Sequence, residues 1–196
     1  EECLRVSTAI LGENHSDTFI SMNNLAILYN NQAEYGKALP LYEECLKRRR
    51  DVLGDNHRDT LDSMNDLAVL YWNQGEYGKS LPLYEDCLRL SKITLGEKHP
   101  DTLRSMNNLA SSYLKQGDYE RALPLYEQSL KILKANLGDT HPSTLHLMNN
   151  LAILYRTQGA NEKAFILYEE CLRISKVVRG DNHPDTLSLM NNLANL

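Results

Sequence analysis

Apolar residues return at three- and four-residue intervals in two stretches of every 42-residue segment of the chain. In one segment, the apolar side chains of residues 100–115 fall on a single helical face, which contains Leu103, Met106, Leu109, Ala110 and Tyr113. Residues 119–137 repeat this spacing with Ala122, Leu125, Tyr126, Ser129, Leu130 and Leu133. The pattern therefore predicts two amphipathic helices per segment, with a turn at Gly117 and an end at Gly138.

The segments repeat one sequence without insertion or deletion. A Leu-Gly-x-x-His junction, with Arg179 replacing the leucine in the last copy, returns every 42 residues and ends at His15, His57, His99, His141 and His183. Such strict spacing predicts that each unit stacks on the next in one geometry. We expect a single array over residues 1–196, made of a partial second helix of a preceding repeat (1–10), repeats 11–52, 53–94, 95–136 and 137–178, and a partial fifth repeat (179–196).

Glycine and proline mark the turns within each unit. Gly75 and Gly159 stand where Gly117 does, at a left-handed helix end, and Ala33 takes this place in the first repeat at some strain. Prolines suit the start of the first helix at Pro100, Pro142 and Pro184. Other prolines fall inside the second helix, where we expect a slight bend, at Pro40, Pro82 and Pro124.

The repeat resembles the tetratricopeptide signature. The resemblance rests on small residues at the helix contact and on a tyrosine and glycine pattern, in Asn108-Leu109-Ala110, Tyr113, Gln116-Gly117-Asp118-Tyr119, Ala122 and Tyr126. Usual tetratricopeptides repeat every ~34 residues. The longer unit, with its Leu-Gly-x-x-His-Pro-Asp-Thr junction, is similar to kinesin light chains and to arrays attached to signalling ATPases. The resemblance implies an all-α, right-handed α-solenoid whose concave groove takes peptides or partner proteins.

Composition narrows the class of partner. The formal net charge is −5, which argues against a nucleic-acid partner because such partners are bound by clustered Lys and Arg. No apolar run approaches the ~18 residues of a membrane span, so we expect no membrane partner. The chain begins within a second helix and ends within a first one. We therefore expect an excerpt of a longer array, and exposed apolar ends that allow end-to-end self-association of the fragment.

Candidate binding residues lie on the face of each first helix opposite its core, which we call the groove arc. Helical geometry assigns to this arc Ile20, Asn23, Asn24, Ile27, Asn30, Asn31, Asp62, Asn65, Asp66, Val69, Trp72, Asn73, Arg104, Asn107, Asn108, Ser111, Leu114, Lys115, His146, Asn149, Asn150, Ile153, Arg156 and Thr157. The main candidate is an amide ladder of Asn24, Asp66, Asn108, Asn150 and Asn192. Amides that donate and accept can bind the backbone of an extended peptide, or can bond one another and fix the stacking of repeats.

Two further features of the arc suggest ligand chemistry. Trp72 is the only tryptophan, and it serves either as an aromatic anchor for a ligand or as packing for the next repeat. The groove arc is acidic at Asp62 and Asp66 and basic at Arg104, Lys115 and Arg156. We expect a ligand with an apolar residue near Trp72 and an acidic one near Arg104 or Lys115, although a simply solvated charged face is the plainer interpretation.

Other regular residues are predicted to be structural. The five junction histidines are too far apart to share a metal ion, so each is expected to organise a helix start. Four cysteines, at Cys3, Cys45, Cys87 and Cys171, occupy one repeat position as reduced packing residues of a cytoplasmic protein. The basic run 47–50 is expected to be a solvated helix end rather than a docking patch.

The sequence contains no phosphate loop, no zinc motif and no nucleophile with an identifiable base, so we predict no catalytic residue, metal or cofactor. The predicted function is a non-catalytic interaction scaffold of the cargo-adaptor kind. The alternatives are a structural spacer or self-associating array, and a regulatory array of a larger signalling ATPase.

Overall fold

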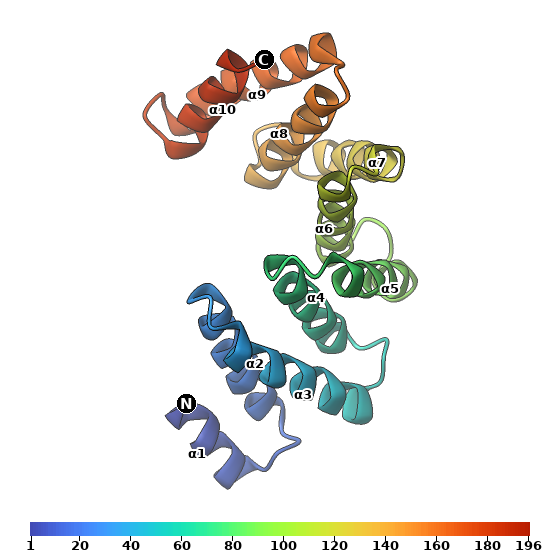
Figure 1. Cartoon of the computed structure of the whole chain (residues 1–196), viewed down its shortest axis with the longest axis vertical. Coiled ribbons are helices and arrows are strands. Elements are labelled where there is room, and N and C mark those ends of the chain that lie inside the picture. Colours follow the sequence, from blue (N-terminus) through green and yellow to red (C-terminus); the bar gives the residue numbers. More distant parts are fainter. The chain divides into compact units, whose positions relative to one another are not determined.

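The computed structural model describes residues 1–196 as a succession of helices joined by short connections (Figure 1). Their bounds are α1 Glu2–Leu11, α2 Ser16–Asn31, α3 Tyr35–Leu53, α4 Arg58–Asn73, α5 Tyr77–Leu95, α6 Pro100–Gln116, α7 Tyr119–Leu137, α8 Pro142–Thr157, α9 Asn161–Arg179 and α10 Pro184–Ala194. The helix starts of α2, α4, α6, α8 and α10 recur every 42 residues, as the sequence predicts. None of these helices is long and apolar enough to cross a membrane.

A histidine accepts the same hydrogen bond at the start of all five first helices. His15, His57, His141 and His183 precede α2, α4, α8 and α10 in extended backbone, and each Nδ1 accepts a hydrogen bond from the backbone N–H two residues later. His99 makes this bond to Asp101 N–H at 3.2 Å. One otherwise unpaired amide of the first turn is thereby satisfied. The predicted role of the histidines at helix starts is confirmed.

The turns between paired helices use the left-handed backbone conformation. Gly117 has a φ of 80°, and Ala33 occupies the same conformation with a φ of 57°. A Cβ is disfavoured there because it approaches the following carbonyl oxygen. The strain predicted at Ala33 is therefore present.

The interior prolines do not end the second helices. Pro40, Pro82 and Pro124 lie within α3, α5 and α7, each 19 residues long. Helix α9 has the same length with Ile166 at that position. The repeat therefore keeps one helix length with or without the proline, and the slight bend remains a prediction.

The chain forms two compact units, residues 1–105 and 106–196, which meet within α6. In the first unit the helices from α1 to α5 each pack against the next, and α2 also contacts α4. Figure 1 shows α2 beside α3 and α4 beside α5. The core of the first unit includes Ala26, Ala38, Tyr42, Met64 and Leu70, all essentially inaccessible to solvent.

Small residues allow the paired helices to approach closely. Ala26 and Ala38 are completely buried in the first unit, and Ala152 and Ala164 are completely buried in the second. The second unit adds fully buried Tyr126, whose hydroxyl is 2.8 Å from Ser111 Oγ. A fully buried large apolar side chain contributes ~1.5–3 kcal/mol, so these repeated contacts account for the strict spacing.

Three cysteines are buried among the core residues, two in the first unit and one in the second. The Sγ atoms of Cys45, Cys87 and Cys171 donate to backbone carbonyls 26 residues earlier, at 3.6, 3.5 and 3.4 Å. They are buried, as predicted for packing residues, whereas Cys3 is exposed.

The basic run at the end of α3 requires a correction. Arg48 bonds Glu44 and Glu13, and Arg50 pairs with Asp55, as expected for a solvated helix end. Arg49, however, is only 5% exposed. The face of α3 toward α4 takes this residue inward, so the solvated interpretation is wrong for Arg49.

Candidate functional site

The groove arc is mostly half-exposed. Asn24 is exposed, and Asn107, Asn108, Asn149 and Asn150 are partly exposed. Asn65 is an exception at 4% exposure, so its side chain contributes little accessible surface. The arc therefore combines accessible amides with at least one that is buried.

The amide ladder forms hydrogen bonds between successive first helices. In the second unit, Asn150 Nδ2 donates to Asn107 Oδ1 at 3.2 Å, and Asn192 Nδ2 donates to Asn149 Oδ1 at 3.0 Å. Each bond, which we call a rung, joins residues 43 apart. These hydrogen bonds thus contribute to repeat stacking.

One rung of the first unit runs in the opposite direction, whereas Asn73 Nδ2 donates to Asn30 Oδ1 at 3.1 Å in the common direction. Asn23 Nδ2 donates to Asp66 Oδ2 at 2.9 Å. An ionised carboxylate only accepts hydrogen bonds, so the residue in the earlier repeat must be the donor here. Burial raises the pKa of Asp66, while the bond from Asn23 and the charge of Arg104 act to lower it. The net effect is a carboxyl group that is harder to ionise than a free one.

Arg104 has carboxylate partners within the protein. It forms an ion pair with Asp62, and a second contact of 3.5 Å joins it to Asp101. Arg58 also binds Asp101, at 2.8 Å. A ligand carboxylate at Arg104 would therefore compete with Asp62.

The remaining predicted side chains differ in environment. Trp72 packs edge-on against Tyr77, with ring centroids 6.4 Å apart, and its buried Nε1 has no hydrogen-bond partner. Lys115 is exposed, whereas Arg156 is half-buried near Tyr168. Burial raises the pKa of Tyr168, and Arg156 opposes that shift. The contact with Tyr77 shows that Trp72 has at least a packing role.

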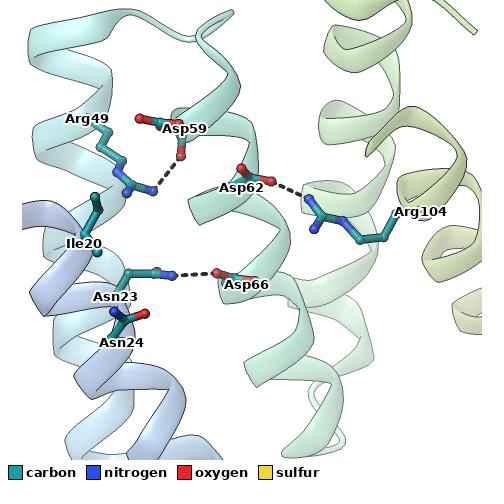
Figure 2. A pocket seen from close by; sticks show the side chains of 8 residues that line it. All are labelled: Ile20, Asn23, Asn24, Arg49, Asp59, Asp62, Asp66 and Arg104. Atoms are coloured by element: carbon teal, nitrogen blue, oxygen red, sulfur yellow. Dashed lines mark hydrogen bonds and ion pairs between the residues drawn. The ribbon is translucent and has the colours of Figure 1, made fainter. Parts of the chain in front are cut away.

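A pocket of about 220 Å³ opens in the first unit between α2, α3 and α4, and Arg104 of α6 also lines it (Figure 2). We call it the Arg49 pocket, and it is lined by Ile20, Asn23, Arg49, Asp62, Asp66 and Arg104, among others. Figure 2 shows Asn23 directed at Asp66 and Arg104 directed at Asp62. Several groove-arc residues predicted from sequence are therefore brought together in one cavity.

Arg49 and Asp59 are the pocket residues that were not predicted from the sequence, and Arg49 is the buried one. Its Nη1 donates to Asp59 O at 2.8 Å and to Ser63 Oγ at 2.7 Å, and its guanidinium lies 6.0 Å from the Phe19 ring centroid. The burial of Arg49 could have been predicted from the equivalent positions of the other repeats, which hold Ser7, Ser91, Leu133 and Ser175. A single arginine among small or apolar residues indicates a position turned inward.

Comparison with protein families identifies the repeat. The tetratricopeptide repeat model matches residues 1–51, 21–93, 59–135 and 101–176. The chain belongs to the tetratricopeptide repeat family. No curated protein matches the chain.

Solved structures confirm the fold class of this tetratricopeptide repeat chain, an all-α solenoid. A Podosopora anserina kinesin light chain-like protein with nearly identical TPR-like repeats is 28% identical, with a TM-score of 0.82 over 92% of this chain and 86% of that one. A variant of it gives a TM-score of 0.81 at 28% identity, over 89% and 82%. BtubC (BKLC) from P. vanneervenii, at 23% identity, shares the fold with a TM-score of 0.79 over 99% and 77%.

Proposed function

We propose that the chain is a non-catalytic scaffold that binds an extended peptide, or a segment of a partner protein, along the groove arc, as a cargo adaptor does. Membership of the tetratricopeptide repeat family and the likeness to a kinesin light chain-like protein support a protein-binding role in general. The observation that carries the finer proposal is the set of half-exposed amides held by rungs, such as Asn107 and Asn149. An extended peptide presents backbone donors and acceptors, and amides already fixed in place bind them with little further loss of entropy.

The charges of the second unit suit an acidic ligand residue. Arg104 already has Asp62 and Asp101 as partners. Arg156 is half-buried without an ion pair, and Lys115 is exposed without one. We therefore assign an acidic residue of the ligand to Arg156 and Lys115 rather than to Arg104.

A displayed peptide library tests this function. Peptides enriched by the full chain are measured by fluorescence anisotropy against the native chain and against the double variant Arg156→Glu, Lys115→Glu. Acidic peptides should lose most of their affinity for the variant and should bind the native chain more weakly at high salt. The matched control is Lys131→Glu with Arg173→Glu, two exposed cations on the second helices of the same unit.

Equal loss in both double variants would show a general charge effect and remove the assignment to Arg156 and Lys115. If the native chain enriches no peptide, the groove function fails, and a spacer or a regulatory array becomes the better account. Helical content by circular dichroism must match across the variants for either conclusion.

A further inference from the structure

Arg179 departs from the repeat and lines a second pocket of the groove. The equivalent residue of every other repeat is a leucine, at Leu11, Leu53, Leu95 and Leu137. The pocket has a volume of about 100 Å³ and lies between α8, α9 and the first turns of α10, and we call it the Arg179 pocket. The Arg179 side chain is only 16% exposed. A cation therefore stands, largely buried, where the other repeats have an apolar side chain.

The other polar groups of this pocket are mainly hydrogen-bond donors. Asn149 accepts from Asn192 through Oδ1, which leaves both N–H groups of its half-exposed amide without a partner. His146 and Ser188 also line the pocket and are exposed, and an imidazole N–H and a hydroxyl can each donate. These three side chains have surface that a ligand can reach.

The Arg49 pocket occupies the equivalent place three repeats earlier and has the opposite character. Three carboxylates line it, at Asp59, Asp62 and Asp66. The Arg179 pocket has one carboxylate, Asp185. The cavity is thus a feature of the stacked repeats, whereas its acidic lining is not, and the second unit presents donors where the first presents acceptors.

Asp185 forms an ion pair with Arg179 and is the competitor of any anion in the pocket. Its side chain is 60% exposed, so it can turn to solvent at little cost, because exposed ion pairs contribute little. A guanidinium also has five N–H donors and can hold two carboxylates. Arg104 differs, since Asp62 and Asp101 both engage it.

The donors and the charge select among possible occupants. A carboxylate only accepts hydrogen bonds, and it pairs with a guanidinium through both oxygens. An amide brings an NH₂ group toward the NH₂ group of Asn149, and an ammonium group is repelled by Arg179. The apolar part of the lining, at Pro142, Leu145 and Leu189, offers a surface for methylene groups. A small acid fits this combination best.

From this arrangement we infer that the Arg179 pocket is a subsite for a carboxylate of the bound peptide, either the side chain of an Asp or Glu or the C-terminus of the peptide. The inference rests on the proposed function, since it assigns a second acidic position of the ligand besides the one at Arg156 and Lys115. Arg179 makes this subsite specific to the second unit, because no other repeat has a cation at this position.

The first test titrates the full chain, labelled with ¹⁵N, with acetate at constant ionic strength. The Arg179 Nε–H signal and the Asn149 side-chain amide signals are followed, and the side-chain amide of Asn107, one repeat earlier, is the internal reference. Acetamide is the matched neutral probe. The variant Arg179→Leu carries the residue of the other repeats and assigns the Arg179 signal by its loss, and Asp185→Asn removes the competitor.

Acetate should shift the Arg179 and Asn149 signals in a saturable way and leave Asn107 unchanged. Arg179→Leu should abolish the shift at Asn149. Asp185→Asn should tighten acetate binding by up to about fivefold, the equivalent of an exposed ion pair. Equal shifts with acetamide, a shift at Asn149 that persists in Arg179→Leu, or the absence of any saturable shift would each overturn the inference.

The second test compares peptide binding by the native chain, by Arg179→Leu and by the control Arg173→Leu, at an exposed cation of the same helix. Peptides selected by the native chain should bind Arg179→Leu about tenfold more weakly and the control unchanged. Exchanging Glu for Gln or Asp for Asn in the peptide reproduces the loss if a side chain occupies the pocket, and amidation reproduces it if the C-terminus does.

The two ideas fail in different ways. Peptides that bind the native chain and Arg179→Leu equally overturn the subsite, while the proposed function stands. If no peptide is selected, the proposed function fails, and the acetate titration still decides whether the Arg179 pocket takes a carboxylate.

Discussion

The side-chain amide of Asn23 donates to the carboxylate of Asp66. Asn150 occupies the position of Asp66 two repeats later, and its side-chain amide instead donates to Asn107. The two rungs have the same 43-residue separation and opposite hydrogen-bond directions. One change from Asn to Asp reverses the direction because a carboxylate has no proton to donate. The reversal leaves Asn23 Oδ1 buried without a hydrogen-bond partner, on a residue that lines the Arg49 pocket.

Replacing Asp66 by Asn should restore the common direction of the rung. The new Nδ2 donates to Asn23 Oδ1, and a buried carboxyl whose ionisation is unfavourable is removed. We expect the free energy of unfolding at pH 7 to rise by roughly 1 kcal/mol, measured by urea denaturation.

The gain from Asp66→Asn should depend on pH. Burial raises the pKa of Asp66 in the folded chain, so protonation favours folding, and this stabilisation of the native chain is fully present only below the unfolded pKa of ~3.9. This stabilisation of the native chain is lost as the pH rises through the folded pKa of Asp66. The gain in free energy of unfolding from Asp66→Asn is therefore largest above that pKa and shrinks on acidification. Asp51→Asn, at an exposed carboxyl of α3, is the control because it removes the same charge at the surface.

Removing the cap of α4 should destabilise the first unit. His57 Nδ1 accepts from Asp59 N–H at 3.2 Å, and His57→Ala leaves that amide unpaired. We expect a loss of about 0.5–2 kcal/mol in thermal denaturation followed by circular dichroism. His57→Asn should recover most of it, because Asn is a strong cap. Equal destabilisation by Ala and Asn would show that the ring packs rather than caps.

Relieving the strained turn should stabilise the chain. Ala33 has a φ of 57°, and the equivalent residue of the second repeat is Gly75, with a φ of 76°. Ala33→Gly should raise the free energy of unfolding by about 1 kcal/mol, since the Cβ clash disappears. The control Ala135→Gly, in α7, should lower it by roughly 0.5–1 kcal/mol. A loss in both variants would contradict the predicted strain.

One repeat position provides a matched test of packing. Leu70 is fully buried, and Leu28, 42 residues earlier, is 51% exposed. Leu70→Ala should cost about 2–5 kcal/mol by leaving a cavity. Leu28→Ala should cost less than about 1 kcal/mol. Similar costs in urea denaturation would show that the two repeats do not differ in packing as described.

The cysteines should differ in reactivity. Burial raises the pKa values of Cys45 and Cys87, and that of Cys171 to about 12, while Cys3 is exposed. At pH 8 a disulfide reagent such as Ellman's should modify Cys3 rapidly and the other three only as the chain opens, because the thiolate is the nucleophile. All four should react at once in denaturant. Rapid native reaction of Cys87 would contradict its burial.

The sequence by itself determined the repeat and its helices. The predicted second helix at residues 119–137 matches α7, and the predicted first helix at residues 100–115 is one residue shorter than α6. These elements were predictable because their signals are local: apolar spacing, a histidine before the helix, and glycine where the backbone is left-handed. The left-handed Ala33 was also predictable, since its equivalents are Gly75, Gly117 and Gly159.

The tertiary structure decided which groups are paired and which are left without partners. The groove arc was predicted from helical geometry, but that geometry says nothing about distances between neighbouring helices. Arg104 meets Asp62 and Asn23 meets Asp66 only because α2, α4 and α6 bring residues 42 and 43 apart into contact. Arg49 is buried because its face of α3 packs toward α4, so a basic run was not uniformly solvated. Burial and hydrogen-bond direction depend on all the side chains around a group, and these come together only when the repeats stack.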